Sequence, residues 1–250
     1  MHPLLLLSLL LQIGCAVHVL RTGRPMYWLF LLLIGSYVAV AIYLLAEILP
    51  ELRHSRGARR VLRGAQERID PERRKREASR MLEVADTLDN RLRLAEESLH
   101  AGDFRQAVDL YRSGLRGQYA TDPHLMLGLA RAQFALGEAA ETRGTLEALI
   151  AANPDFRSAD GHLLYARALE ACGEVGMALE EYQAVTQGFP GEEARVRFGL
   201  LLKRSGRHAE ADALFAESLK RAELSPRYYR RDQHEWLDIA KREISPDAVR

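Results

Sequence analysis

The pattern of hydrophobic and polar positions changes twice along the chain. Residues 3–20 and 26–49 form two apolar runs, and their one charged residue is Glu47, near the end of the second run. Residues 51–87 are dense in charge and poor in apolar side chains. From residue 88, small and apolar positions recur with a period of about 34 residues, the signature of stacked structural repeats. The chain therefore divides into an apolar part, a charged linker and a repetitive part.

Each apolar run is long enough to cross a bilayer as a helix, because about 20 residues at roughly 1.5 Å rise span its hydrocarbon core. We expect a two-helix transmembrane hairpin in residues 1–50, with a tight turn at residues 21–25. Basic residues are retained on the cytoplasmic side of a membrane. The turn holds Arg21 and Arg24, whereas the stretch after the second run holds more arginines: Arg53, Arg56, Arg59, Arg60 and Arg63. This bias predicts both ends and the repeats in the cytoplasm. The arginine-rich, lysine-poor composition is typical of a GC-rich bacterial genome, hence a bacterial inner membrane.

The hairpin also carries a family resemblance. Tyr27-Trp28, Gly35 and Tyr43 resemble the two-helix membrane module at the N-terminus of cardiolipin synthases and related phospholipase D-type proteins. The sequence departs from that family at Ile34, where proline often precedes the glycine. It also lacks the family's His-x-Lys catalytic signature. Independently of the family, Tyr27 and Trp28 suit the membrane interface, because their rings are apolar and their tips polar.

Two features of residues 51–99 each allow two interpretations. The basic amphipathic stretch of the linker, residues 51–87, either lies against an anionic leaflet or is a solvated helix. A heptad spacing runs through Ala78, Met81, Ala85, Leu88, Leu92, Ala95 and Leu99. This seam either forms a parallel homodimer through residues 78–99 or packs on the first repeat.

Four repeats are expected, at residues 88–121, 123–156, 159–192 and 192–225. Each places a glycine between two helices, at Gly102, Gly137, Gly173 and Gly206, and Pro154 and Pro190 close the middle two. This helix-turn-helix pattern resembles the tetratricopeptide repeat family. The fold class we expect is all-α: the membrane hairpin followed by an α-solenoid. Residues 226–250 are expected to form a capping helix and tail.

Small residues at unit position 8 are expected where the two helices of each repeat meet: Ala95, Ala130, Ala166 and Gly199. The family resemblance also implies that the first helix of each repeat, helix A, lines a concave groove, usually through unit positions 2, 5, 6, 9, 12 and 13. The groove residues that it implies are Glu96, His100, His124, Arg131, Phe134, Arg167, Glu170, Arg197, Lys203 and Arg204. Arg131 and Arg167 occupy the same position in successive repeats and suit an acidic ligand. The alternative is that these arginines pair with acidic residues of adjacent helices.

Nothing in the sequence indicates catalysis, a cofactor or a metal site. There is no phosphate-binding glycine loop, and Cys15 and Cys172 have no metal-ligand spacing. The net charge is +1, whereas a nucleic-acid-binding protein typically carries a strong excess of positive charge. We therefore expect a membrane-anchored scaffold that recruits a protein partner. The alternative is an accessory subunit that acts through its hairpin in lipid or haem-protein biogenesis.

Overall fold

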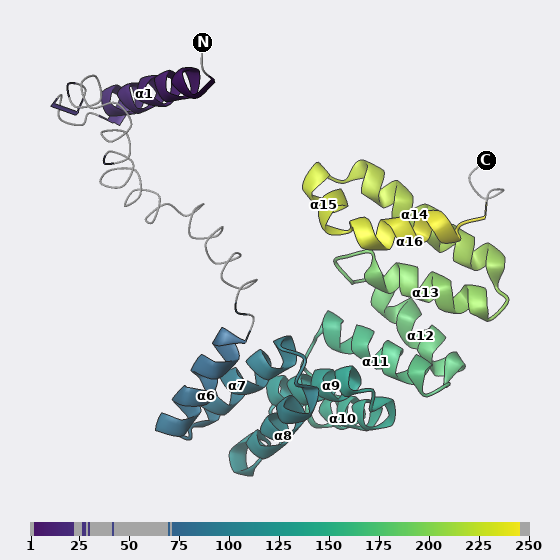
Figure 1. Cartoon of the computed structure of the whole chain (residues 1–250). Coiled ribbons are helices and arrows are strands. Elements are labelled where there is room, and N and C mark those ends of the chain that lie inside the picture. The colour runs from purple at the N-terminus through teal and green to yellow at the C-terminus, as the bar shows by residue number, and fades with distance from the viewer. Residues whose placement is uncertain are drawn as a thin grey trace. The chain divides into compact units, whose positions relative to one another are not determined.

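The computed structural model describes residues 3–22, 27, 28, 30, 42, 70 and 72–245 (Figure 1). Every regular element in these ranges is helical. The chain separates into two compact units, Met1–Arg73 and Arg74–Arg250. The all-α repeat architecture lies in the second unit.

In the first unit, helix α1 (Pro3–Thr22) covers the first apolar run. Most of the second run, Gly35 and Tyr43 included, lies outside the described residues, as do Arg53, Arg56, Arg59, Arg60 and Arg63. We expected a membrane span at each run. Among the residues that the structure describes, however, none of the helices combines the length and apolar character needed to cross a bilayer.

The heptad seam does not lie on one continuous helix. Helix α6 (Arg73–Val84) ends before residues 85–87, and α7 (Leu88–His100) begins after its N-cap, Thr87. The side-chain amide of Asn90 donates to the carbonyl oxygens of Met81 (3.1 Å) and Ala85 (2.8 Å), and it thereby caps the end of α6. Leu88, Leu92 and Leu99 pack against the core of the first hairpin, and Ala95 is buried within it. The seam is thus used chiefly for packing on the first repeat.

Four helical hairpins follow one another from teal to green in Figure 1. They are α7 with α8 (Phe104–Gly114), α9 (Pro123–Leu136) with α10 (Ala139–Ala152), α11 (Ala159–Ala171) with α12 (Val175–Thr186), and α13 (Glu193–Arg204) with α14 (His208–Leu224). A short 3-10 helix, η2 (Gly117–Tyr119), joins the first two hairpins. Each second helix also packs on the first helix of the next hairpin. The four hairpin turns hold Gly102, Gly137, Gly173 and Gly206, all with φ between 79° and 89°, where other residues are strained.

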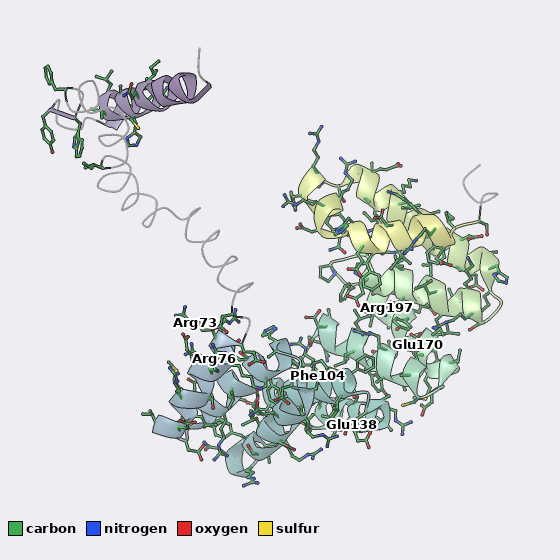
Figure 2. The ribbon with its side chains drawn as sticks, in the orientation of Figure 1. Arg73, Arg76, Phe104, Glu138, Glu170 and Arg197 are labelled. Carbon is green, nitrogen blue, oxygen red and sulfur yellow. The ribbon has the colours of Figure 1, made fainter. Side chains whose placement is uncertain are left out.

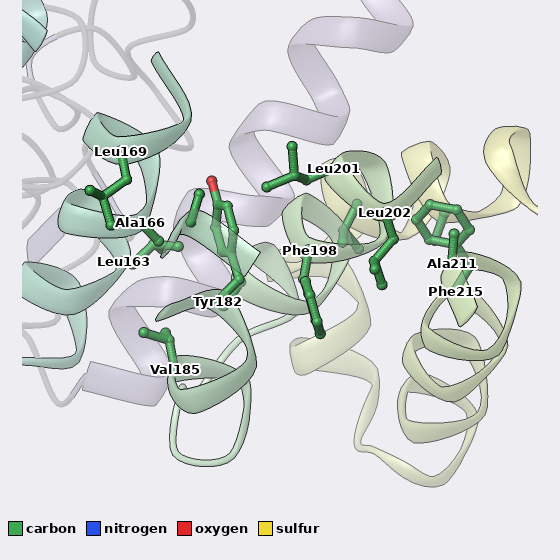
Figure 3. Close-up of a cluster of buried hydrophobic side chains, with 14 residues drawn as sticks. Leu163, Ala166, Leu169, Tyr182, Val185, Phe198, Leu201, Leu202, Ala211 and Phe215 are labelled. Carbon is green, nitrogen blue, oxygen red and sulfur yellow. The ribbon is translucent and has the colours of Figure 1, made fainter. Parts of the chain in front are cut away.

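Small residues bring the two helices of each hairpin together. Ala95, Ala130 and Ala166 have no exposed surface. In the second helices Ala107, Ala178 and Ala211 are equally buried, and Thr142 takes the corresponding place in α10. The Thr142 hydroxyl donates to the carbonyl oxygen of Glu138 (2.7 Å), so this buried polar group is satisfied. Figure 3 shows the largest core cluster, in which Ala166 and Tyr182 of the third hairpin pack with Phe198 and Phe215 of the fourth.

The C-terminal segment forms two helices instead of the single capping helix that we expected. Helix α15 (Arg227–Asp232) begins after Pro226, and α16 (His234–Glu243) packs on α13 and α14. Leu237 and Ala240 are buried on its inner side. Helix α16 therefore closes the last hairpin at the place where a further repeat would continue the stack.

A buried ion cluster fixes these last helices. Glu192 has no solvent exposure, and its carboxylate accepts hydrogen bonds from Nη1 of Arg195 (2.7 Å), the hydroxyl of Tyr229 (2.7 Å) and Nε of Arg221 (3.2 Å). Its backbone N–H donates to Oε1 of Gln233 (2.9 Å). A buried carboxylate needs such partners, because an unpaired charge is expensive away from water. The cluster joins α13, α14 and α15 at one point.

Candidate partner-binding face

The candidate face follows the first helices of the second, third and fourth hairpins and ends on α16. We call its side chains the A-helix row: Arg131 and Phe134 of α9, Arg167 of α11, Glu193 and Arg197 of α13, and Trp236 of α16. From Phe134 to Trp236 these side chains contact one another from helix to helix, and Arg131 precedes them on α9. Figure 2 labels Arg197 on α13 and, on the neighbouring α11, Glu170. The side chains of Arg131, Arg167 and Arg197 are 46%, 31% and 27% exposed, respectively.

Arg167 lies at the centre of the row. Its guanidinium carbon stands 4.6 Å from the ring centroid of Phe134, a cation–π distance. Its Nη1 atom is 3.9 Å from Oε1 of Glu193, which is too far for a hydrogen bond. Burial lowers the pKa of Arg167, and the positive charge of Arg197 lowers it further. Arg167 is therefore a partly desolvated cation with weak compensation.

Arg197 is better satisfied. Its Nε donates to Oε1 of Glu193 at 2.8 Å, and its guanidinium carbon lies 4.7 Å from the ring centroid of Trp236. The same carboxylate oxygen of Glu193 thus serves Arg197 directly and Arg167 at longer range. Two guanidinium groups share one carboxylate.

Arg131 has a partner of its own. Its Nη2 lies 3.4 Å from Oδ2 of Asp160 at the start of α11, and 46% of its side chain is exposed. The expected pairing with an acidic residue of an adjacent helix is thus observed for Arg131, whereas Arg197 pairs with Glu193 of its own helix. Among the described residues, the one carboxylate within 4.0 Å of the Arg167 guanidinium is that of Glu193, at the long distance of 3.9 Å.

Three other expected groove residues, Glu170, Lys203 and Arg204, are held by intramolecular contacts. The Glu170 carboxylate accepts a hydrogen bond from the buried hydroxyl of Tyr182 (2.7 Å) and pairs with Arg204. Burial raises the pKa of Tyr182 well above its usual value, and Glu170 adds to this effect. Lys203 donates to the backbone oxygen (2.7 Å) and the carboxylate (3.1 Å) of Glu243, at the end of α16.

The remaining expected residues stand apart from these contacts. The ring of His124 meets Phe156 edge-on, with 5.4 Å between centroids. Glu96 is exposed on α7, where its charge helps burial to raise the pKa of Tyr111 to about 12. In the first unit, the rings of Tyr27 and Trp28 lie 5.4 Å apart, with Tyr27 exposed and Trp28 buried. Their role as interface anchors stays a prediction.

Two members of the A-helix row were missed by sequence reasoning. Glu193 stands at unit position 2, which the family resemblance assigns to the groove, so its signal was present in the sequence. Trp236 was assigned only to the cap, because no repeat spacing links it to Arg197. No group of three or more His, Cys, Asp or Glu residues that could hold a metal occurs in the part of the chain that the structure describes.

Comparison with known proteins agrees with this architecture. Residues 98–168 match the tetratricopeptide repeat family model. A crystal structure of MamA is 22% identical, covers 60% of this chain and 86% of its own, and has a TM-score of 0.52. TTC0263, a thermophilic tetratricopeptide repeat protein of Thermus thermophilus, is 20% identical, covers 70% of this chain and 88% of its own, and has a TM-score of 0.51. The MamA RS-1 ArsTM double mutant is 17% identical, covers 67% of this chain and 97% of its own, and has a TM-score of 0.55. No curated protein matches the chain.

These structures share the fold of the second unit, and the chain contains tetratricopeptide repeats. Tetratricopeptide repeat proteins bind peptides or proteins and are typically non-catalytic scaffolds. The two-helix membrane module has no match among these comparisons.

Proposed function

We propose that this tetratricopeptide repeat protein is a non-catalytic scaffold that holds a protein partner along the A-helix row. The observation that carries the proposal is the row itself, in which arginines from three successive hairpins keep 46%, 31% and 27% of their side chains exposed. A core needs apolar side chains, so charged groups aligned along one face of a solenoid are available for binding. Aromatic rings beside them supply contact area, as Phe134 and Trp236 do.

We also propose that the scaffold is tethered to the cytoplasmic face of a bacterial inner membrane, with both ends of the chain inside. This part rests on the sequence: the apolar runs at residues 3–20 and 26–49, and the excess of arginine after the second run. A tether of this kind would concentrate the partner at the membrane surface. A reporter active only in the cytoplasm, fused after Arg250, should be active, and activity of a periplasm-only reporter there would overturn this topology.

Site-specific photocrosslinking in cells tests the binding face. A photoreactive residue replaces Ala135, which is exposed beside Phe134 on α9, and in a control strain it replaces Glu180, which is exposed on α12. We expect the α9 probe to capture a discrete protein and the α12 probe to capture none. Equal capture by both probes would contradict a face-specific site. Capture confined to probes in residues 3–49 would favour the accessory-subunit alternative.

A further inference from the structure

Arg167 differs from the other two arginines of the A-helix row, because its guanidinium has no hydrogen-bond acceptor within the described part of the chain. Arg131 reaches Asp160 at 3.4 Å and Arg197 reaches Glu193 at 2.8 Å. Among the described residues, none accepts a hydrogen bond from the Arg167 guanidinium, and the one carboxylate oxygen within 4.0 Å of it stands at 3.9 Å. Only 31% of the Arg167 side chain is exposed, so water replaces the missing partners only in part.

The surroundings of Arg167 are selective for a carboxylate. The Phe134 ring lies against its guanidinium, with 4.6 Å between the ring centroid and the guanidinium carbon, and the planar N–H fork is the part that hydrogen-bonds a ligand. A carboxylate matches that edge with two parallel hydrogen bonds. Arg197 adds a second positive charge, and Glu193, the carboxylate nearest to both arginines, is already engaged by Arg197. A carboxylate supplied by a ligand would therefore give Arg167 the close anionic partner that Glu193 gives Arg197.

The position of Arg167 indicates which part of a partner supplies this carboxylate. Helices α7 and α9 precede α11 in the stack, and α13 and α16 follow it. A segment that spans the row therefore continues on both sides of Arg167, and the residue that it places there is internal to the segment. A terminal carboxylate would leave half of the row without contact.

We propose that Arg167 is the anchor of the partner site, and that it binds an acidic side chain within an extended partner segment, with Phe134 against one face of its guanidinium. This assignment rests on the proposed function, since it names the partner chemistry of the same face. Arg131, the equivalent residue one repeat earlier, should contribute less to partner binding than Arg167, because Asp160 already pairs with it.

A selected peptide tests the assignment. Random 12-residue peptides displayed at the N-terminus of a phage coat protein, and so without a free C-terminal carboxylate, are selected on the purified full chain. The strongest binder is synthesised as an amide, and its Kd is measured by fluorescence anisotropy. The protein is compared with Arg167→Gln, with Arg167→Lys, which keeps the charge but loses the planar fork, and with the matched control Arg112→Gln, at an exposed position of α8 outside the A-helix row. Each Asp or Glu of the peptide is changed in turn to Asn or Gln.

We expect an acidic residue in the selected peptides and roughly ten- to hundred-fold weaker binding to Arg167→Gln, as for loss of a charge-assisted pair. Arg167→Lys should recover only part of this loss, and Arg112→Gln should bind within about three-fold of the original chain. Neutralising one peptide carboxylate should weaken binding to the original chain and leave binding to Arg167→Gln unchanged, because the two changes remove the same contact.

Peptides selected without an acidic residue, or equal affinity for Arg167→Gln, would overturn this assignment and leave the scaffold function standing. Binding of a free-acid peptide whose amide fails to bind would also overturn it, in favour of a terminal carboxylate. If no peptide or captured protein binds the chain, the proposed function falls as well. Circular dichroism melts confirm that each variant is folded.

Discussion

The hydroxyl of Tyr229 lies 2.7 Å from Oε1 of Glu192, a carboxylate with no solvent exposure, and this hydrogen bond ties α15 to the start of α13. The last two helices carry Trp236 and Glu243, which contact Arg197 and Lys203. The geometry of the last part of the A-helix row thus depends on a contact made outside it.

Removing that hydroxyl should loosen the C-terminal cap. Tyr229→Phe keeps the ring and leaves one lone pair of a buried carboxylate without its donor, which should cost about 1.5–3 kcal/mol. Chemical denaturation measures the change. Tyr228→Phe is the matched control, because the Tyr228 side chain is exposed and its change should have little effect. Equal stability of the two variants would show that the Tyr229 contact does not hold the cap.

Enlarging a small residue in a hairpin interface should destabilise the repeats. Ala166→Leu adds volume where Ala166 has no exposed surface, in the core cluster shared with Tyr182, and should cost about 1–3 kcal/mol. Ala171→Leu, at an exposed position of the same helix, should be nearly neutral. Unchanged thermal melts for Ala166→Leu would mean that this helix pair is not close-packed.

Two glycines in helices should respond in opposite directions to alanine. A Cβ atom at Gly199 would lie 2.6 Å from Cε1 of Phe215, so Gly199→Ala forces the ring to move and should lower stability by about 1–3 kcal/mol. At Gly144 a Cβ atom meets nothing within 4 Å, and Gly144→Ala should raise stability by about 0.4–1 kcal/mol. Urea midpoints of both variants test the pair, and the same sign for both would contradict the packing described for Gly199.

Stability should fall at alkaline pH through buried tyrosines. Burial raises the pKa of Tyr111 to about 12, and it also raises that of Tyr182. A tyrosine whose pKa is higher in the folded than in the unfolded state binds its proton more tightly when folded. The stability that this tighter proton binding adds is fully present below about pH 10, the pKa of an unfolded tyrosine. For Tyr111 this added stability is lost as the pH rises towards 12. Urea midpoints between pH 8 and 11 should decline above pH 10, less steeply for Tyr111→Phe. A flat profile would contradict this linkage.

The repeats were readable from the sequence because their determinants are local and recur. A glycine at each turn and a small residue at unit position 8 mark each hairpin, and both follow from backbone geometry and close packing. The break between α6 and α7 was harder to predict from the sequence. The heptad spacing continues across it, whereas the cap that ends α6 depends on one side chain, Asn90.

Contacts between distant residues were beyond sequence reasoning. Arg197 with Trp236, and Glu192 with Tyr229, join residues 39 and 37 positions apart, and both pairs depend on how α15 and α16 fold back. From the sequence, Arg131 and Arg167 were predicted to have the same role in binding, because they occupy the same position in successive repeats. They differ because Asp160 lies within reach of Arg131, whereas Arg167 shares Glu193 with Arg197.

The most direct test of the account is capture of native partners by a chain with two reversed charges on the A-helix row. Arg131→Glu combined with Arg167→Glu repels an acidic segment and should leave the repeat cores intact, since both side chains are partly exposed (46% and 31%). The matched control is Arg105→Glu with Arg112→Glu, which makes the same change in charge at exposed positions of α8, a second helix of a hairpin. Partners pulled down from detergent extracts are compared with those of the original chain, at equal helicity by circular dichroism. The account predicts that the row variant loses its partner while the α8 variant retains it, and undiminished capture by a well-folded row variant would contradict it.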